Sequence, residues 1–214
     1  MSKTCYKVAK RTFDILLATL IWIITSPFML IIAIIIKLSD GGDIFASSPI
    51  RIAKNKYLFM YKFRTMHTNG DENLKNENPI LYEQYLENHK LPLNADPRVT
   101  RIGKFLRRTD LDELPQVINV IMGNMSIVGP RPYHKWEIDK IVRENDPIAI
   151  KNIKDIETVK PGMTGLWQVS GRNRLKLKER LELDALYARN QSIWLDLRII
   201  LKTPYTVISG KGRI

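Results

Sequence analysis

The feature that most constrains this chain is an apolar run near its start. Residues 15–36 form a stretch of 22 without a charged side chain. As a straight helix it would be about 33 Å long, enough to cross the hydrocarbon core of a bilayer. It is apolar on every side, unlike an amphipathic core helix, and too long for a cleaved signal peptide. The sequence therefore predicts a membrane anchor.

Two details favour an anchor that enters and leaves by the same membrane face, with a single-pass helix as the alternative. Basic residues flank the run on both sides, and positive charge keeps a flank on the cytoplasmic face. Ser26-Pro27 stands inside the run, where proline removes a backbone donor and clashes with the preceding turn. We therefore predict a re-entrant membrane hairpin over residues 1–39, broken at Ser26 and Pro27, before a cytoplasmic domain over residues 40–214.

Charge indicates the class of partner. The 34 Lys and Arg residues against 22 Asp and Glu give a net charge of +12, which predicts an anionic partner. Nucleic acid, a phospholipid surface and a phosphorylated small molecule all satisfy this condition. One cysteine, Cys5, excludes an intramolecular disulfide and a cysteine-based zinc site, and three histidines argue against a His-rich metal site.

After the anchor, the pattern predicts a helix-rich α+β domain with a few short strands. Glycine and proline mark residues 161–165 as a turn. Apolar or aromatic runs predict strands over residues 57–63, 126–128 and 166–169. Helical patterns cover residues 77–88, 111–122, 176–189 and 193–208, and residues 135–157 are predicted as helix and polar loop. The last helix fits core packing, and a helix at the membrane interface is the alternative.

The candidate chemistry lies in residues 107–116, where Asp112 and Glu113 are adjacent and close to Arg107. Two neighbouring carboxylates can supply a nucleophile and a ligand for a hard cation such as Mg²⁺, and nearby arginines keep carboxylates ionised. A structural alternative is that Asp110 and Glu113 form a capping box at the start of a helix.

Two basic loops are candidates for binding phosphate. Prolines on both sides of Arg131 fix the backbone that presents its guanidinium, and Arg172 lies in a second loop, Gly171-Arg172-Asn173-Arg174. A turn with a solvated arginine is the alternative for each. The sequence contains no P-loop and no strand-led GxGxxG motif, which disfavours a P-loop ATPase and a dinucleotide-binding fold.

Ordered motifs along nearly the whole chain resemble one family, the bacterial monotopic phosphoglycosyl transferases, also called bacterial sugar transferases. The motifs are Lys10-Arg11-x-Phe13-Asp14, Ser26-Pro27, Tyr61-Lys62-Phe63-Arg64-Thr65-Met66, Asp96-Pro97-Arg98, Leu111-Asp112-Glu113-Leu114-Pro115-Gln116, Gly129-Pro130-Arg131-Pro132, Lys160-Pro161-Gly162-Met163-Thr164-Gly165 and Gln168-Val169-Ser170-Gly171-Arg172. The resemblance implies a re-entrant anchor and a catalytic domain on the cytoplasmic face of the bacterial inner membrane.

It also implies a ping-pong reaction. Asp112 would attack the β-phosphorus of a UDP-sugar, expel UMP and hold the sugar phosphate as an aspartyl ester, which polyprenyl (undecaprenyl) phosphate then accepts. Glu113, with Asp112, would bind Mg²⁺. Arg107 and Arg131 match substrate-binding residues of the family. Weaker matches are Lys62, Arg64 and Arg172.

The implied substrate is a UDP-hexose such as UDP-galactose or UDP-glucose, and the implied role is the first membrane step of exopolysaccharide, capsule, O-antigen or glycoprotein glycan synthesis. Inner-membrane phospholipid is a further expected partner, nucleic acid is not, and a homodimer is left open. The chain departs from the family pattern over residues 43–53 and at Asp110, where serine is common. Two alternatives are a membrane-anchored nucleic-acid-binding protein and a non-catalytic scaffold.

Overall fold

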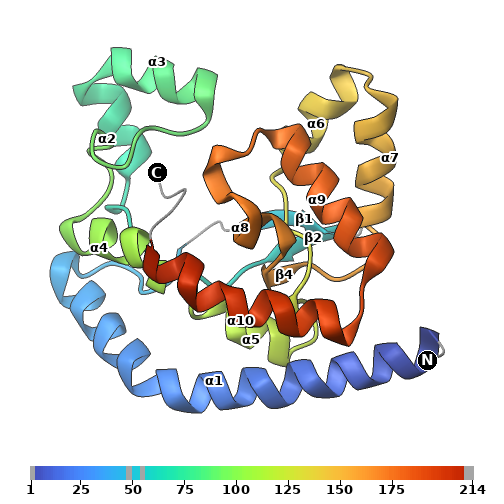
Figure 1. Ribbon diagram of the computed structural model, residues 1–214. Coiled ribbons are helices and arrows are strands. Elements are labelled where there is room, and N and C mark those ends of the chain that lie inside the picture. The colour runs from blue at the N-terminus through green and yellow to red at the C-terminus, as the bar shows by residue number, and fades with distance from the viewer. Residues whose placement is uncertain (1–2, 47–49, 54–55, 210–214) are drawn as a thin grey trace.

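A computed structural model describes residues 3–46, 50–53 and 56–209, and the predicted helix-rich class with few strands is confirmed (Figure 1). The helices are α1 (Lys3–Asp40), α2 (Gly70–Glu77), α3 (Pro79–Asn88), α4 (Arg101–Thr109), α5 (Gln116–Ile121), α6 (Lys135–Arg143), α7 (Pro147–Ile156), α8 (Leu166–Ser170), α9 (Leu177–Asn190) and α10 (Ile193–Ser209), with short 3₁₀ helices η1 (Leu111–Glu113) and η2 (Arg172–Arg174). The strands are β1 (Ile50–Ala53), β2 (Lys56–Phe59), β3 (Ser126–Val128) and β4 (Gly162–Thr164).

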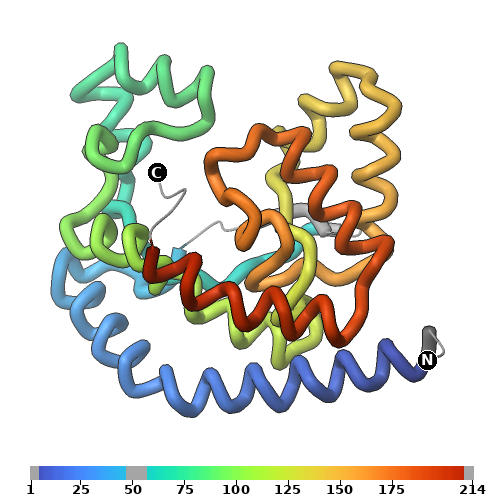
Figure 2. The backbone as a smooth tube through the Cα atoms, viewed as in Figure 1, coloured from blue at the N-terminus to red at the C-terminus, as the bar shows by residue number. Residues whose placement is uncertain are grey.

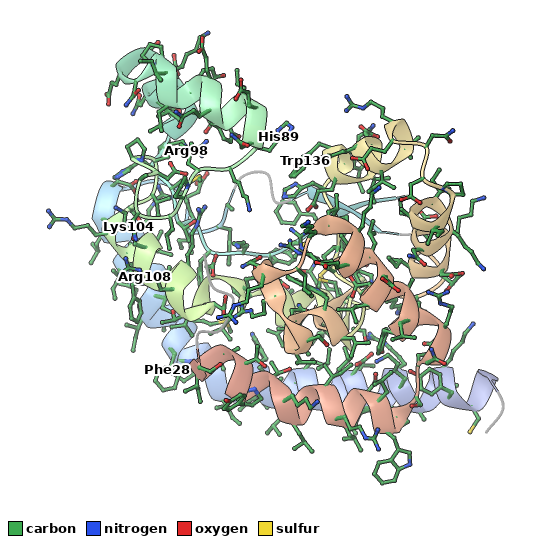
Figure 3. The ribbon with its side chains drawn as sticks, turned by 45° about the horizontal axis from the view of Figure 1, so that its top comes forward. Phe28, His89, Arg98, Lys104, Arg108 and Trp136 are labelled. Carbon is green, nitrogen blue, oxygen red and sulfur yellow. The ribbon has the colours of Figure 1, made fainter. Side chains whose placement is uncertain are left out.

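The apolar run lies within α1, a single helix that contains Pro27. Its two halves meet at a bend, and Phe28, labelled in Figure 3, lies near that corner. Proline has no N–H to donate to the carbonyl four residues earlier, which belongs to Ile23. The Ser26 hydroxyl donates to that carbonyl at 3.1 Å. The interruption expected at Ser26-Pro27 is therefore a bend within a continuous helix, and the serine satisfies the carbonyl that proline leaves without a donor.

One side of α1 packs on the body of the protein along both halves. Ala18 in the first half is fully buried, in a cluster with Val117, Val120 and other core residues. Ile32 and Ile36 in the second half are buried against Phe63 and Leu106. The other side exposes large apolar residues, namely Leu16, Leu20, Ile23, Ile24, Phe28, Leu30, Ile31, Ile34, Ile35 and Leu38.

Buried polar contacts fix the first half of α1. Asp14 is 3 % exposed and accepts from Ser126 Oγ at 2.7 Å and from the Ile127 amide at 3.1 Å. Lys10 Nζ donates to Asp196 on α10 at 2.8 Å. The Arg11 guanidinium donates to backbone carbonyls at the end of α5, where the helix dipole favours a cation.

The strands form two small sheets. β1 and β2 are an antiparallel hairpin, and β3 and β4 pair in parallel, with Ser126 opposite Gly162 and Val128 opposite Thr164. The backbones of the second sheet approach closely, because a Cβ at Gly162 would lie 2.1 Å from the Gly129 nitrogen. These positions therefore accept no side chain.

Two of the predictions around β4 and α8 are wrong. Residues 166–169, predicted as a strand, form helix α8, and the predicted turn at 161–165 contains strand β4. A short apolar run does not distinguish a strand from a buried helical turn by its periodicity. In α8 it is Trp167 that is buried, while Leu166 and Val169 only partly pack against the core.

Helices α2 and α3 form a hairpin that stands apart from the rest of the chain (Figure 2). Residues 71–96 are net acidic, and α3 matches the predicted solvated helix at 77–88. Arg98 connects the hairpin to the body: its guanidinium bonds Asp96 through two nitrogens, pairs with Asp71 at 2.7 Å and lies 3.9 Å from the ring centroid of Tyr85.

Asn119 connects two parts of the body, and its role can be tested. Its fully buried side chain accepts from the Tyr61 amide at 2.9 Å and donates to the Phe59 carbonyl at 2.7 Å. Replacing it with alanine removes the side-chain partner of both part-buried backbone groups, so we expect Asn119→Ala to lower the free energy of unfolding by roughly 1 to 3 kcal/mol. Thermal or chemical unfolding measures this, with the exposed Asn124→Ala as control. Equal stability of the two variants would contradict the prediction.

Candidate active site

The two adjacent carboxylates lie beside a lysine from another part of the chain. The Phe63 amide donates to the Asp112 carbonyl at 2.9 Å, which places the segment after β2 against η1. The Lys62 ammonium nitrogen lies 2.8 Å from Asp112 Oδ2 and 3.2 Å from Glu113 Oε1. The side chain of Asp112 is 3 % exposed and that of Glu113 is 46 % exposed. One carboxylate is thus enclosed and the other reaches solvent.

The chain reverses direction immediately before this pair. Asp110 ends α4 with a left-handed φ of 58°, and its amide donates to the Leu106 carbonyl. Its carboxylate accepts from Arg172 at 2.8 Å and caps no helix, so the capping-box alternative is wrong. The helix predicted over 111–122 is instead the short turn η1 followed by α5, and Leu114 and Pro115 separate the two. Asp112 and Glu113 therefore project from a tight turn between two helices.

Burial acts to raise the pKa of both Asp112 and Glu113, and the charge of Lys62 acts to lower it. Burial raises the pKa of Asp112, and the nearby charge of Lys62 offsets only part of this effect. Burial also acts to raise the pKa of Glu113, but the charges of Lys62 and Arg131 outweigh it and the pKa is lowered. Between two carboxylates, Lys62 itself has a raised pKa although burial opposes it. Glu113 is thus the more readily ionised of the pair.

The structure places the predicted arginines at different distances from this pair. Arg107 donates to Thr65 at 2.8 Å, and its charge acts on Asp112. Arg131 pairs with Glu137 at 2.7 Å, and its charge acts on Glu113. Arg172 reaches the site through its ion pair with Asp110. Arg64 is engaged elsewhere: it pairs with Asp40 at the end of α1 and with the Asp43 carbonyl.

A polar cavity lies on the Arg131 side of the site. It has a volume of about 710 Å³ and is lined by the end of α3, by α6 and by the start of α9. Its acidic lining residues are Glu87, Glu137 and Glu144. Its basic lining residues are Lys90, Arg131, Lys140, Arg143, Lys176 and Arg180. The excess of positive charge suits an anionic ligand.

An apolar groove lies on the Glu113 side. It has a volume of about 390 Å³ and runs between α1, α8 and α10. Glu113, Asp110 and Arg172 line it, together with the apolar residues Leu17, Ile21, Met163, Val169, Ile200 and Val207. The pair of carboxylates is therefore flanked by a polar cavity at Arg131 and an apolar groove at Glu113.

Asp184 is a residue of this site that the sequence analysis did not single out. It is fully buried, and its Oδ2 accepts from the Arg131 amide at 2.9 Å and from the Tyr133 hydroxyl at 2.8 Å. It thereby holds the Pro-Arg-Pro turn that presents Arg131. Asp184 lies on the apolar face of α9 with Leu181 and Ala188. This position could have singled it out in the sequence, because an acid on such a face is buried only when hydrogen-bond or charge partners surround it.

Comparison with known proteins gives a consistent result. The sequence model of the bacterial sugar transferase family matches residues 5–210. The exopolysaccharide production protein ExoY of Rhizobium meliloti is 41 % identical over 209 residues, which cover 96 % of this chain and 88 % of that protein. The undecaprenyl-phosphate galactose phosphotransferase of Salmonella typhimurium is 38 % identical over 99 % of this chain and 43 % of its own length. The UDP-glucose:undecaprenyl-phosphate glucose-1-phosphate transferase of Escherichia coli is 38 % identical over 96 % of this chain and 41 % of its own length.

The pH dependence of stability tests the buried state of Asp184. Burial raises the pKa of Asp184 to about 7. The folded protein then holds this proton more tightly than the unfolded chain, so the stabilisation is greatest below about pH 4 and is lost as the pH rises towards 7. The amide of Asp184→Asn can accept the same two hydrogen bonds and does not ionise. We expect this variant to lose less stability than the parent between pH 5 and pH 8, by a few kcal/mol.

The measurement is the midpoint of chemical unfolding across that pH range. Glu182→Gln is the matched control, because Glu182 is exposed on the same helix. Parallel pH profiles for the parent and Asp184→Asn would contradict the prediction, because they would show that Asp184 is already ionised in the folded protein between pH 5 and pH 8.

Proposed function

Because the chain belongs to the bacterial sugar transferase family, we propose that it transfers a sugar-1-phosphate from a UDP-sugar to undecaprenyl phosphate and releases UMP. The observation that carries this proposal is the pair Asp112 and Glu113, held by Lys62, between a cationic cavity and an apolar groove. A soluble nucleotide sugar matches the cavity in charge. A polyprenyl chain matches the groove in polarity, and it would bring its phosphate to the same carboxylates.

The reaction we infer has two displacements at one phosphorus atom. An Asp112 carboxylate oxygen bonds to the β-phosphorus, and the bond to the bridging oxygen breaks, so that UMP leaves with that oxygen. A phosphate oxygen of undecaprenyl phosphate then attacks the same phosphorus and expels the Asp112 carboxylate. Lys62 supports the ionised form of Asp112 against the effect of burial, and Arg107 and Arg131 would bind phosphate oxygens.

Mg²⁺ fits the oxygen donors of the site. Glu113 is half-exposed next to Asp112, and among the described residues no group of three or more acids, histidines or cysteines forms a closed metal cage. This matches an ion that uses one or two carboxylates, substrate phosphates and water. We propose that Glu113, with Asp112, holds Mg²⁺, which would neutralise charge on the diphosphate.

We also propose that the chain lies on one face of the membrane, the cytoplasmic one. Both halves of α1 pack on the same body, and a helix crossing the bilayer would place its halves on opposite sides. The exposed apolar side of α1 then enters the lipid. On α10, Ile199 packs into the core, and the exposed stripe of Trp194, Leu201 and Tyr205 on another face suits the membrane interface. The basic flanks of α1 favour the cytoplasmic side.

The sugar we propose is a hexose, and the process is exopolysaccharide synthesis. The names of the similar proteins refer to galactose, glucose and exopolysaccharide production. Screening UDP-galactose, UDP-glucose and their N-acetylated counterparts for UMP release identifies the donor.

Removing the nucleophile tests the mechanism. We expect Asp112→Asn to reduce UMP release by roughly 1,000-fold or more, since removing a covalent nucleophile typically costs at least this much. Acid quench of the parent with a sugar-labelled donor should leave label on the protein, and Asp112→Asn should carry none. Asp139→Asn, an exposed acid on α6, is the control. Full turnover by Asp112→Asn would exclude it as the nucleophile.

Thiol labelling tests the membrane path. Cys5 is exposed in the first turn of α1 and reports the leading flank. In a Cys5→Ser background, Asp43→Cys reports the trailing flank, where Asp43 is exposed. A membrane-impermeant maleimide should label both positions in inside-out vesicles and neither in intact spheroplasts. Labelling of the two positions from opposite faces would show that α1 crosses the bilayer.

A further inference from the structure

An aromatic stack lies at the mouth of the polar cavity. The ring of Trp136 on α6 stacks with His89 at the end of α3, with centroids 4.5 Å apart and planes at 26°, and with His134 at 5.9 Å. Figure 3 labels Trp136 and His89, which face each other from the body and from the hairpin. Both residues line the polar cavity.

This stack is not part of a hydrophobic core. Trp136 is only partly buried, His89 is exposed, and Trp136 belongs to no buried cluster in the part of the chain that the structure describes. Its ring is covered by a histidine from a hairpin whose packing is mainly internal. An indole in such a position offers a flat face that a planar ligand can take.

The stack is joined to the phosphate-binding side of the site. Glu137, the neighbour of Trp136, accepts from the His134 amide at 2.8 Å and from Arg131 at 2.7 Å. The turn that carries the indole therefore also fixes the arginine whose charge acts on Glu113. An aromatic face in the first turn of α6 is thus linked through Glu137 to Arg131 in the preceding turn.

A nucleotide combines the two properties that this arrangement recognises, a flat base and anionic phosphates. We infer that Trp136 is the stacking platform for the uracil base of the donor, on the face that His89 covers, with the diphosphate extending past Arg131 towards Asp112. This inference rests on the proposed function, and it assigns the part of the cavity that holds the nucleoside. Stacking on an aromatic side chain is tolerant of base identity, so contacts from the surrounding polar residues would select uracil.

Binding of UDP alone tests the assignment without depending on the unidentified sugar. We expect calorimetric titration of the full-length protein with UDP to show binding. We expect Trp136→Leu to weaken it roughly tenfold, a change of about 1.4 kcal/mol. Trp136→Phe should retain most of the affinity, because it keeps an aromatic face. Tyr57→Leu is the control, since Tyr57 is an aromatic residue 72 % exposed on β2.

Steady-state kinetics distinguishes a loss of nucleotide binding from a loss of catalysis. With the active donor, Trp136→Leu should raise the KM for UDP-sugar about tenfold while kcat and the KM for undecaprenyl phosphate stay near the parent values. Equal UDP affinity in the parent, Trp136→Leu and Tyr57→Leu would overturn the subsite, and UMP release by the same preparations would leave the proposed function intact. If the parent neither binds UDP nor releases UMP from any UDP-sugar, the proposed function fails and the subsite fails with it.

Discussion

The packing of one bent apolar helix determines the arrangement of the rest of the molecule. Helix α1 contacts the body through Ala18 in its first half and through Ile36 in its second. A straight helix of this length would contact a small domain over part of its length only. The bend near Pro27, with Ser26 bonded to the Ile23 carbonyl, lets both halves follow the body while their other side stays apolar and exposed. The groove beside Glu113 exists because α1 forms one of its walls.

The site itself depends on charge balance within a tight turn. Asp112 is enclosed, and an enclosed carboxylate next to a second one is stable only near a cation, which Lys62 supplies from a distant segment. Lys62 acts to lower the pKa of both acids, but burial still raises the pKa of Asp112, whereas the pKa of Glu113 is lowered. Two neighbouring carboxyl groups therefore differ in ionisation, because burial outweighs the cations at Asp112 and the charges of Lys62 and Arg131 outweigh burial at Glu113.

The sequence predicts those parts of the structure that follow from local chemistry. The apolar run, the interruption at Ser26-Pro27, strand β3 and the adjacent acids are all visible in short stretches of residues. The partners of those acids are not, because the pairing of Lys62 with Asp112 and of Arg172 with Asp110 joins segments about 50 to 60 residues apart. The errors have the same origin: β4 is fixed by its pairing with β3, α8 packs against α9 and α10, and Asp110 takes a left-handed conformation that replaces the expected cap. The role of Asp184 is not visible in its own segment of the sequence, because that role is to bind the backbone of the Arg131 turn about 50 residues away.

The α2–α3 hairpin has a consequence for how such a chain can diversify. Its described packing is mainly internal, and Arg98 joins it to the body through Asp96, Asp71 and the Tyr85 ring. A module attached in this way can be lengthened, shortened or exchanged without repacking the core or moving the catalytic turn. Because the hairpin also supplies one wall of the polar cavity, its replacement would alter ligand preference while the chemistry stays the same. Grafting is thus a route by which new specificity could arise on a fixed catalytic body.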